Sequence, residues 1–240
     1  MKVPTYLSAP GVVCALGDTL QEIANRLFAG DSSGMQPLAG WVADSVLTCG
    51  VVAAVLPEVP EHLPQHDTRN NRLLMAAVMP LQEQLQQLVE YFGPQRIGVV
   101  TGTSTSGILE AGQHIGHWAR TGELPESYSY HQQELADPAL FLSRWLGLQG
   151  PAYSISTACT SGARALLSAR RLLQAGICDA VLCGGADSLC HLTLNGFSSL
   201  EAVRAMSRYC WPAAGPAPMP TIFPRRLPMV PVPYRPCSRR

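Results

Sequence analysis

The segment 152–184 limits the possible folds more than any other part of the chain. Residues 152–157 and 179–184 are short apolar runs that predict strands. Between them, alanine and leucine side chains recur at helical spacing over 161–174, and Gly176 can end that helix. A strand, a helix and a strand in this order form a βαβ unit, in which the strands run parallel. The segment therefore predicts an α/β fold with a helix-covered parallel sheet.

The rest of the chain up to this unit also alternates between helices and strands. The hydrophobic pattern predicts helices over 18–30, about 70–91 and 137–147. It predicts a strand or a pair of short strands over 46–55 and a strand over 97–100. Asp18 and Asp137 are the expected N-caps of the first and third helices. Pro80 predicts a kink or break in the second helix.

Composition divides the chain near residue 204. Apolar residues make up 47% and charged residues 14%, against a usual charged share of about 25%. All 17 acidic residues lie within 1–201, whereas 202–240 contain seven arginines and no acidic residue. Nine of the 20 prolines lie within 212–240. This pattern predicts a folded domain over 1–203 and an unstructured Pro/Arg-rich tail over 204–240.

The same composition argues against several classes of protein. The net charge is zero, which does not favour a nucleic-acid binder. No apolar run reaches the roughly 18 residues that a membrane span requires. The eight cysteines show no CxxC pair or framework spacing, which is typical of reduced thiols in a cytoplasmic protein.

Several short segments resemble functional motifs but lack a residue or a spacing that the motif requires. Gly102 to Gly107 has the spacing of a phosphate loop but lacks the lysine that would hold a phosphate. No GxSxG nucleophile motif occurs. The cysteines near His191 lack the paired spacing of a zinc site, so no metal is expected. His114 and His117 lie three residues apart in a possible helix start, and an exposed polar turn is the favoured interpretation.

Cys159 is the strongest candidate for chemistry. It lies between the predicted strand and helix, where free backbone N–H groups and the helix dipole favour an anion. Such a position favours the thiolate, which is the nucleophilic form. Small neighbours (Ala158, Ser161 and Gly162) leave room for a substrate, and the turn would aim a backbone N–H at an oxyanion. The alternative is one more buried thiol of the core.

Five regions of the chain, including the Cys159 turn, follow one another in a family-specific order. They are Gly11–Gly17, Asn71–Leu74, Gly98–Gly107, Ser156–Gly162, and Cys183–Asp187 together with Asn195–Phe197. In sequence and in order they resemble the β-ketoacyl-acyl carrier protein synthases, over about residues 1–203. Thiolases share the fold and a cysteine nucleophile, but the glycine turn fits the synthases better.

The resemblance implies a fold, a reaction and a set of site residues. The family has the thiolase-like fold, two similar α/β halves packed in alternating layers, and this chain resembles the first half. Cys159 would take an acyl group from a carrier protein, and a malonyl unit would then lose carbon dioxide and attack that group. The expected substrate-binding residues are Thr103, Ser104, Thr105, Ser106, Gly107 and Ile108.

The resemblance also implies partners. These are an acyl carrier protein, whose phosphopantetheine carries the substrates, and a second subunit in a homodimer or heterodimer. No other cofactor is expected. The glycine turn and the Cys159 context resemble the branch that makes aryl polyenes or related lipids, with fatty acid and polyketide synthesis left open.

The family's second half supplies two histidines and a lysine that this chain does not match. No histidine follows His191, and Lys2 is the only lysine. With the change of composition near 203–207, this favours a reading-frame change over a genuine proline-rich linker. The expectation is a chain that can be acylated at Cys159 but does not catalyse condensation alone. The alternatives are a non-catalytic partner subunit, which Cys159 argues against, and an inactive fragment.

Overall fold

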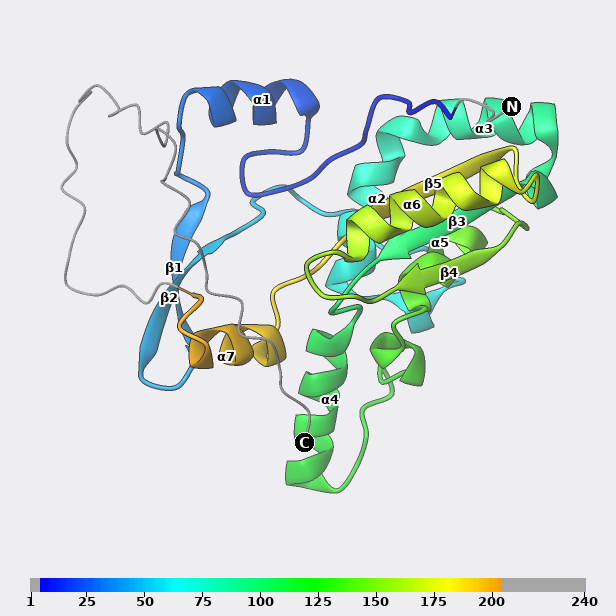
Figure 1. The fold of residues 1–240 in the computed structure, drawn as a ribbon. Coiled ribbons are helices and arrows are strands. Elements are labelled where there is room, and N and C mark those ends of the chain that lie inside the picture. Colours follow the sequence, from blue (N-terminus) through cyan, green and yellow to red (C-terminus); the bar gives the residue numbers. More distant parts are fainter. Residues whose placement is uncertain (1–4, 204–240) are drawn as a thin grey trace, which may run out of the picture. The chain divides into compact units, whose positions relative to one another are not determined.

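The computed structural model describes residues 5–203. It contains a parallel sheet of three strands that lies between helices (Figure 1). The strands are β3 (Ile97–Gly102), β4 (Ala152–Ile155) and β5 (Ala180–Gly185), in the spatial order β4–β3–β5. Helix α6 (Ser161–Gln174) connects β4 to β5. The parallel strands and the helix predicted for 152–184 are therefore confirmed, but β3 separates the two strands of the unit.

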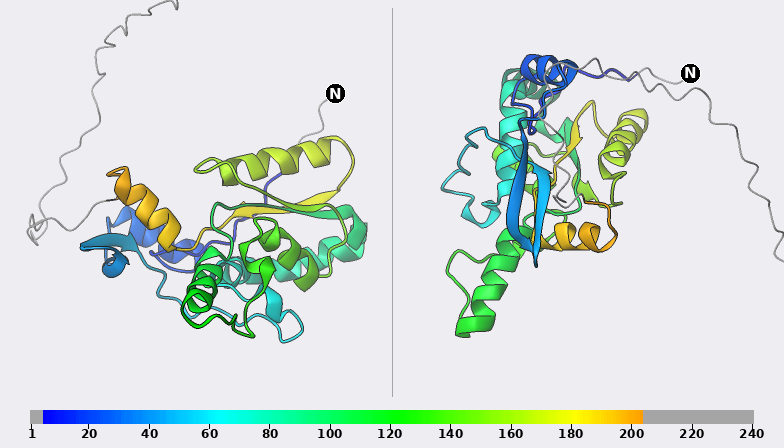
Figure 2. Two further views of the ribbon diagram at one scale, coloured as in Figure 1. Left: turned by 90° about the horizontal axis from the view of Figure 1, so that it is seen from below. Right: turned by 90° about the vertical axis from the view of Figure 1, so that its left-hand side faces the viewer.

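The two faces of this sheet are covered differently. Helix α6 lies on one face, and α5 (Asp137–Trp145), α2 (Arg69–Val78) and α3 (Gln82–Phe92) lie on the other (Figure 2). The main core fills the second face, because the apolar side chains of α2, α3 and α5 meet β3 there. Its buried members are Leu63, Leu74, Met75, Val78, Leu85, Ile97, Val99, Ala139, Phe141, Leu142 and Leu148.

The long helix predicted for 70–91 is broken at the expected place. A short 3-10 turn, η2 (Met79–Leu81), separates α2 from α3 and contains Pro80. Proline has no N–H to donate and its ring clashes with the preceding turn, so the α-helix cannot continue through it. The break turns the chain so that α2 and α3 both supply apolar side chains to the same core.

The N-terminal part forms a hairpin with a helix on it. β1 (Met35–Val42) pairs antiparallel with β2 (Ser45–Gly50), and α7 (His191–Ser199) packs against β1. The strand predicted for 46–55 therefore ends at Gly50. Helix α1 (Leu20–Phe28) is capped by Thr19, whose Oγ1 accepts from the Glu22 amide at 3.2 Å. The prediction that Asp18 caps this helix was wrong by one residue.

Two other sequence predictions were wrong. His114 and His117 lie within helix α4 (Ile108–Thr121), not in an exposed turn, and the His114 ring bonds to Gln132 at 3.1 Å. Asp137 begins α5 as expected but makes no cap. Its side chain is fully buried and accepts hydrogen bonds from other buried side chains.

Asp137 is the centre of a buried polar network. Its carboxylate bonds to His66 Nδ1 and accepts from Asn71 Nδ2 at 2.7 Å. Arg144 Nη1 lies 2.6 Å from His66 Nε2. Because a guanidinium can only donate, Nε2 must be the bare acceptor, and Nδ1 carries the hydrogen that Asp137 receives. The network ties the 3-10 turn η1 (Pro64–His66), α2 and α5 together.

Other expectations concern the whole chain. The tail predicted for 204–240 lies outside the described residues. Within 5–203, no helix is long and apolar enough to cross a membrane. The six cysteines of that range are unpaired: Cys14, Cys49, Cys159, Cys178, Cys183 and Cys190.

Candidate active site

Cys159 sits on a sharp turn between β4 and α6. Ala158 has a φ of 52°, in the left-handed region that non-glycine residues rarely occupy. The Ser161 side chain holds this turn: its Oγ accepts from the Thr157 amide at 2.9 Å and donates to the Ala158 carbonyl at 2.6 Å. The turn brings the chain from the end of the strand directly into the helix, with Thr160 as the helix N-cap.

The thiol of Cys159 is accessible at this turn. The residue is exposed. Within the described residues its backbone amide has no hydrogen-bond acceptor. It precedes the N-terminus of a 14-residue helix, where the helix dipole favours negative charge. The arrangement can support an attacking thiolate and, beside it, an oxyanion formed at the attacked carbonyl.

Glycines allow the first turn of α6 to close on the carboxyl ends of β3 and β5. A Cβ on Gly102 would lie 2.4 Å from the Ser161 carbonyl carbon, and one on Gly185 would lie 3.3 Å from the Gly162 Cα. Side chains at Gly102 and Gly185 would therefore push the Cys159 helix away. Cys159 thus lies at the carboxyl edge of a parallel sheet, where α/β proteins commonly bind ligands.

The predicted substrate-binding loop begins at the same edge. The Thr103 amide donates to the carbonyl of Ile155, the last residue of β4, at 3.1 Å. Four of the six predicted residues are buried, and two are partly accessible. The buried ones are Thr103, Thr105, Ser106 and Gly107, and the partly accessible ones are Ser104 and Ile108. Ser106 Oγ donates to the Glu134 carbonyl at 2.8 Å.

Sequence reasoning did not single out Asp187, which organises this loop. Asp187 Oδ1 accepts from the Ser104 amide at 2.7 Å and from the Thr105 amide at 3.1 Å. The Thr103 and Thr105 hydroxyls also donate to it. The available signal was its place in the Cys183–Asp187 segment, directly after a strand that ends at the same edge as β3.

Three other thiols of the described chain differ from Cys159 in environment. Burial raises the pKa of the half-buried Cys183 thiol in β5. Burial is also the main cause that raises the pKa of Cys178, before β5, and of Cys49 in β2. Such thiols remain protonated and act as small apolar side chains. No cluster of three or more metal-ligating side chains occurs between residues 5 and 203.

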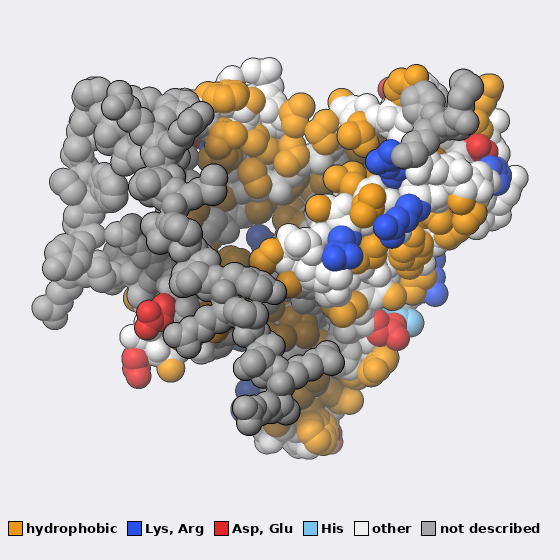
Figure 3. All heavy atoms as spheres, in the orientation of Figure 1, with side chains coloured by type: hydrophobic (Ala, Val, Ile, Leu, Met, Phe, Trp, Pro, Cys, Tyr) orange, Lys and Arg blue, Asp and Glu red, His pale blue; other side chains and the backbone are white. Residues whose placement is uncertain are grey.

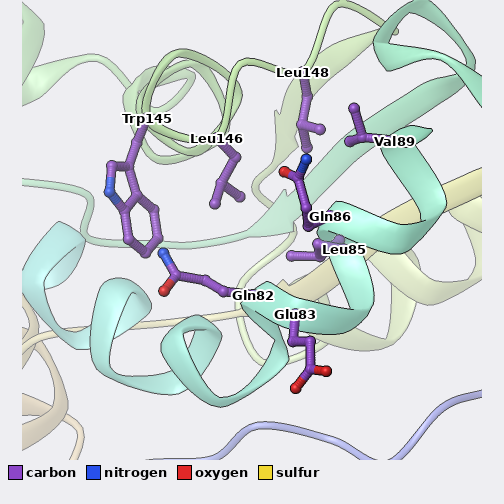
Figure 4. Close-up of a pocket in the computed structure, with 8 residues that line it drawn as sticks. All are labelled: Gln82, Glu83, Leu85, Gln86, Val89, Trp145, Leu146 and Leu148. Carbon is purple, nitrogen blue, oxygen red and sulfur yellow. The ribbon is translucent and has the colours of Figure 1, made fainter.

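A hollow on the described surface is separate from this site. A cavity of about 410 Å³ lies between α3 and the end of α5 (Figure 4). Its lining residues are Gln82, Glu83, Leu85, Gln86, Val89, Trp145, Leu146 and Leu148. None of them belongs to the Cys159 turn or to the loop after β3.

Around the turn, α6 presents a mixed surface. Leu166 and Leu167 are 46% and 43% exposed. Arg164, Arg170 and Arg171 are exposed on the same helix. Basic side chains lie among hydrophobic ones on this face (Figure 3).

Comparison with known proteins relates this geometry to one family. The family model described as "Beta-ketoacyl synthase, N-terminal domain" matches residues 68–214. The chain is 28% identical over 202 residues to 3-oxoacyl-[acyl-carrier-protein] synthase 2 of Synechocystis sp., covering 80% of the chain and 48% of that protein. It is 24% identical over 213 residues to nodulation protein E of Rhizobium leguminosarum bv. trifolii, covering 82% and 49%.

A solved structure agrees with these matches. It contains the ketosynthase ApeO in complex with its chain length factor ApeC from Xenorhabdus doucetiae, with 43% identity and a TM-score of 0.78. The match covers 83% of this chain and 51% of that chain. The predicted thiolase-like α/β fold of a first half is thereby confirmed. The chain spans about half the length of these relatives.

Proposed function

Since the chain belongs to the β-ketoacyl synthase family, we propose that Cys159 is the nucleophile that receives an acyl group from a thioester. The observation that carries this proposal is the exposed thiol on a strained turn at the start of α6, beside an amide that donates to no described group. A nucleophile held between a strand end and a helix N-terminus is pre-oriented for attack.

The first step exchanges one thioester for another. The Cys159 thiolate forms a bond to the acyl carbonyl carbon, and the carbonyl oxygen becomes an oxyanion. The Cys159 amide is placed to donate to that oxyanion. The carbon–sulfur bond to the donor then breaks, and the donor leaves as a thiolate that takes up a proton. The acyl group remains on Cys159.

The second step belongs to the longer protein of which such a domain is part. A malonyl thioester loses carbon dioxide, and the electron pair left on its α-carbon attacks the acyl carbonyl. The bond to Cys159 breaks, and the sulfur leaves as the thiolate. The products are a β-ketoacyl thioester, carbon dioxide and the regenerated Cys159.

The names of the relatives support the proposed partners. A 3-oxoacyl-[acyl-carrier-protein] synthase acts with an acyl carrier protein, so we propose that such a carrier delivers both substrates here. The ApeO structure contains a chain length factor, which supports a second condensing-enzyme subunit as partner. We propose a cytoplasmic location, and residues 1–203 as the N-terminal domain.

The loop after β3 is proposed to form one wall of the acyl-binding site. With Thr103, Thr105, Ser106 and Gly107 buried, Ser104 and Ile108 are the positions with surface to offer an acyl chain. We propose that these two contact substrate and that the other four define the wall behind them. A non-catalytic partner subunit would not require an exposed cysteine on this turn.

The test is acylation of the purified chain. The chain is incubated with an acyl-pantetheine thioester, and the mass added to each cysteine peptide is measured. We expect the acyl group on Cys159 and its loss in Cys159→Ala. The matched control Cys183→Ala should be acylated like the wild type. Acylation of Cys159→Ala at the wild-type rate would refute the proposal.

A further inference from the structure

One oxygen of Asp187 holds the loop that follows β3. The amides of Ser104 and Thr105 donate to Oδ1 at 2.7 and 3.1 Å. The hydroxyls of Thr103 and Thr105 donate to the same atom at 3.2 and 3.1 Å. Successive backbone amides that converge on an anion form a nest, and here the anion is the chain's own carboxylate. These amides are therefore occupied and not available to a substrate.

The loop needs these bonds because its conformation is strained. Ser106 has a φ of 45°, which is unfavourable for a residue with a side chain. Thr103 Oγ1 accepts from the amides of Thr105 and Ser106 at 3.2 and 2.9 Å, and Thr105 Oγ1 accepts from the Ser188 amide at 3.1 Å. Both threonine hydroxyls point their hydrogens at Asp187. Loss of its carboxylate would leave both hydroxyls and the Ser104 amide to find new partners, whereas the Thr105 amide would keep only its bond to Thr103 Oγ1.

The base of the loop touches the helix of the nucleophile. Gly102 packs against the backbone of Ser161 and Gly162, and its carbonyl accepts from the Ala186 amide at 3.1 Å. Ser161 in turn bonds to the backbone on both sides of the Cys159 turn. Because no side chain separates these two backbone segments, a displacement of the loop is transmitted directly to the start of α6. A continuous path of contacts therefore leads from Asp187 to Cys159.

We propose that Asp187 is a positioning residue for Cys159, acting through the loop after β3 and the first turn of α6. The inference rests on the proposed function of Cys159 and adds a residue outside its immediate neighbourhood. Asp187 does not need to touch substrate. Its charge fixes the loop, and the loop fixes the angle at which the thiol leaves the turn.

Asp179, at the other end of β5, provides a matched control for Asp187. Asp179 precedes β5, whereas Asp187 follows it. Asp179 is exposed and pairs with Arg96 at 2.7 Å, at the amino end of the strands and away from the carboxyl edge. Substitution of Asp179 removes an acidic side chain next to β5 without touching the loop or the Cys159 turn.

The experiment compares the wild type, Asp187→Ala, Asp187→Asn and Asp179→Ala in the full chain. Amide hydrogen exchange is followed in peptides that cover 102–107 and 156–161. The single-turnover rate of acyl transfer to Cys159 is measured against the concentration of an acyl-pantetheine thioester, which gives a maximal rate constant of acylation and a half-saturating thioester concentration. We expect exchange in both peptides to rise about ten-fold in Asp187→Ala, as loss of charge-assisted bonds implies. The maximal rate constant of acylation should fall by a similar factor, with the half-saturating thioester concentration within about two-fold.

The outcomes separate positioning from simple support of a loop. Asp187→Asn keeps the size of the side chain and one acceptor oxygen, so it should fold and show intermediate values even if Asp187→Ala does not fold. Asp179→Ala should match the wild type. The inference is overturned if faster exchange is confined to 102–107 while exchange in 156–161 and the maximal rate constant of acylation stay unchanged. If the wild type itself is not acylated, the proposed function fails, and the exchange data alone decide the role of Asp187.

Discussion

Replacement of Asp137 by alanine tests how much the buried polar network contributes to stability. The carboxylate is the acceptor for His66 Nδ1 and for Asn71 Nδ2, and all three residues are fully buried. Each donor left without a partner in the interior costs about 1–3 kcal/mol. The loss from both donors is therefore about 2–6 kcal/mol.

The assay is equilibrium unfolding in urea. With a urea dependence of about 2 kcal/mol per molar, the midpoint of Asp137→Ala should fall by about 2 M. Asp137→Asn should fall less, because its carbonyl oxygen still accepts from His66 while its amide faces the Asn71 amide. Asp179→Ala serves as the control, since its ion pair with Arg96 is exposed and such pairs contribute little.

The reasoning depends on burial and on the direction of each hydrogen bond. If Asp137→Ala and Asp179→Ala shift the midpoint equally, the network contributes no more than a surface ion pair, and the argument from burial is refuted. If Asp137→Asn is as stable as the wild type, the hydrogen assignment that Arg144 imposes on His66 is wrong.

Two further predictions concern the sheet edges. Gly102→Ala should lower the free energy of unfolding by about 1–3 kcal/mol and slow acylation of Cys159, because its Cβ would meet the Ser161 carbonyl carbon at 2.4 Å. Gly184→Ala is the control in both assays, because nothing lies within 4 Å of its Cβ. The Arg96 guanidinium holds the pKa of Asp179 below its usual value. The ion pair therefore stabilises the fold at pH values above the unfolded-state pKa of about 4. This contribution is lost as the pH falls through the lower pKa of the folded state. The difference in urea midpoint between wild type and Asp179→Asn should therefore shrink at acidic pH, and a difference that grows on acidification would contradict this assignment.

Some elements could be predicted from the residues that form them. The bounds of α6 agree with the prediction over 161–174, because alanine and leucine spacing and a terminal glycine mark both the face and the end of that helix. Pro80 marked the break between α2 and α3. In both cases the cause lies within a few residues of its effect.

Other elements could not be predicted, because they contain residues that disfavour the secondary structure they adopt. β1 contains Pro37 and Gly40, which disfavour strands, and it is tolerated because it lies in a two-stranded hairpin with a free edge. Helix α4 contains Gly112 and Gly116, which lower helix propensity. Tertiary packing overrides propensity at these positions.

The candidate site was only partly predictable for a related reason. The position of Cys159 between strand and helix follows from neighbouring residues. Asp187 bonds to a loop more than 80 positions earlier in the chain, and Asp137 bonds to His66, which is 71 positions away. An aspartate that begins a helix looks the same in sequence whether it caps that helix or accepts from a distant histidine.

The position of β3 between β4 and β5 has a consequence for the order in which the chain folds. The β4–α6–β5 segment cannot form a sheet by itself, since Val99 pairs with both Ala152 and Leu182, and none of the three is close to another in sequence. Closing such long loops before contacts form slows folding. The strand that precedes Cys159 must dock on β3 before α6 can settle over it. We therefore expect the thiol of a newly made chain to become ordered only once both long-range pairings exist.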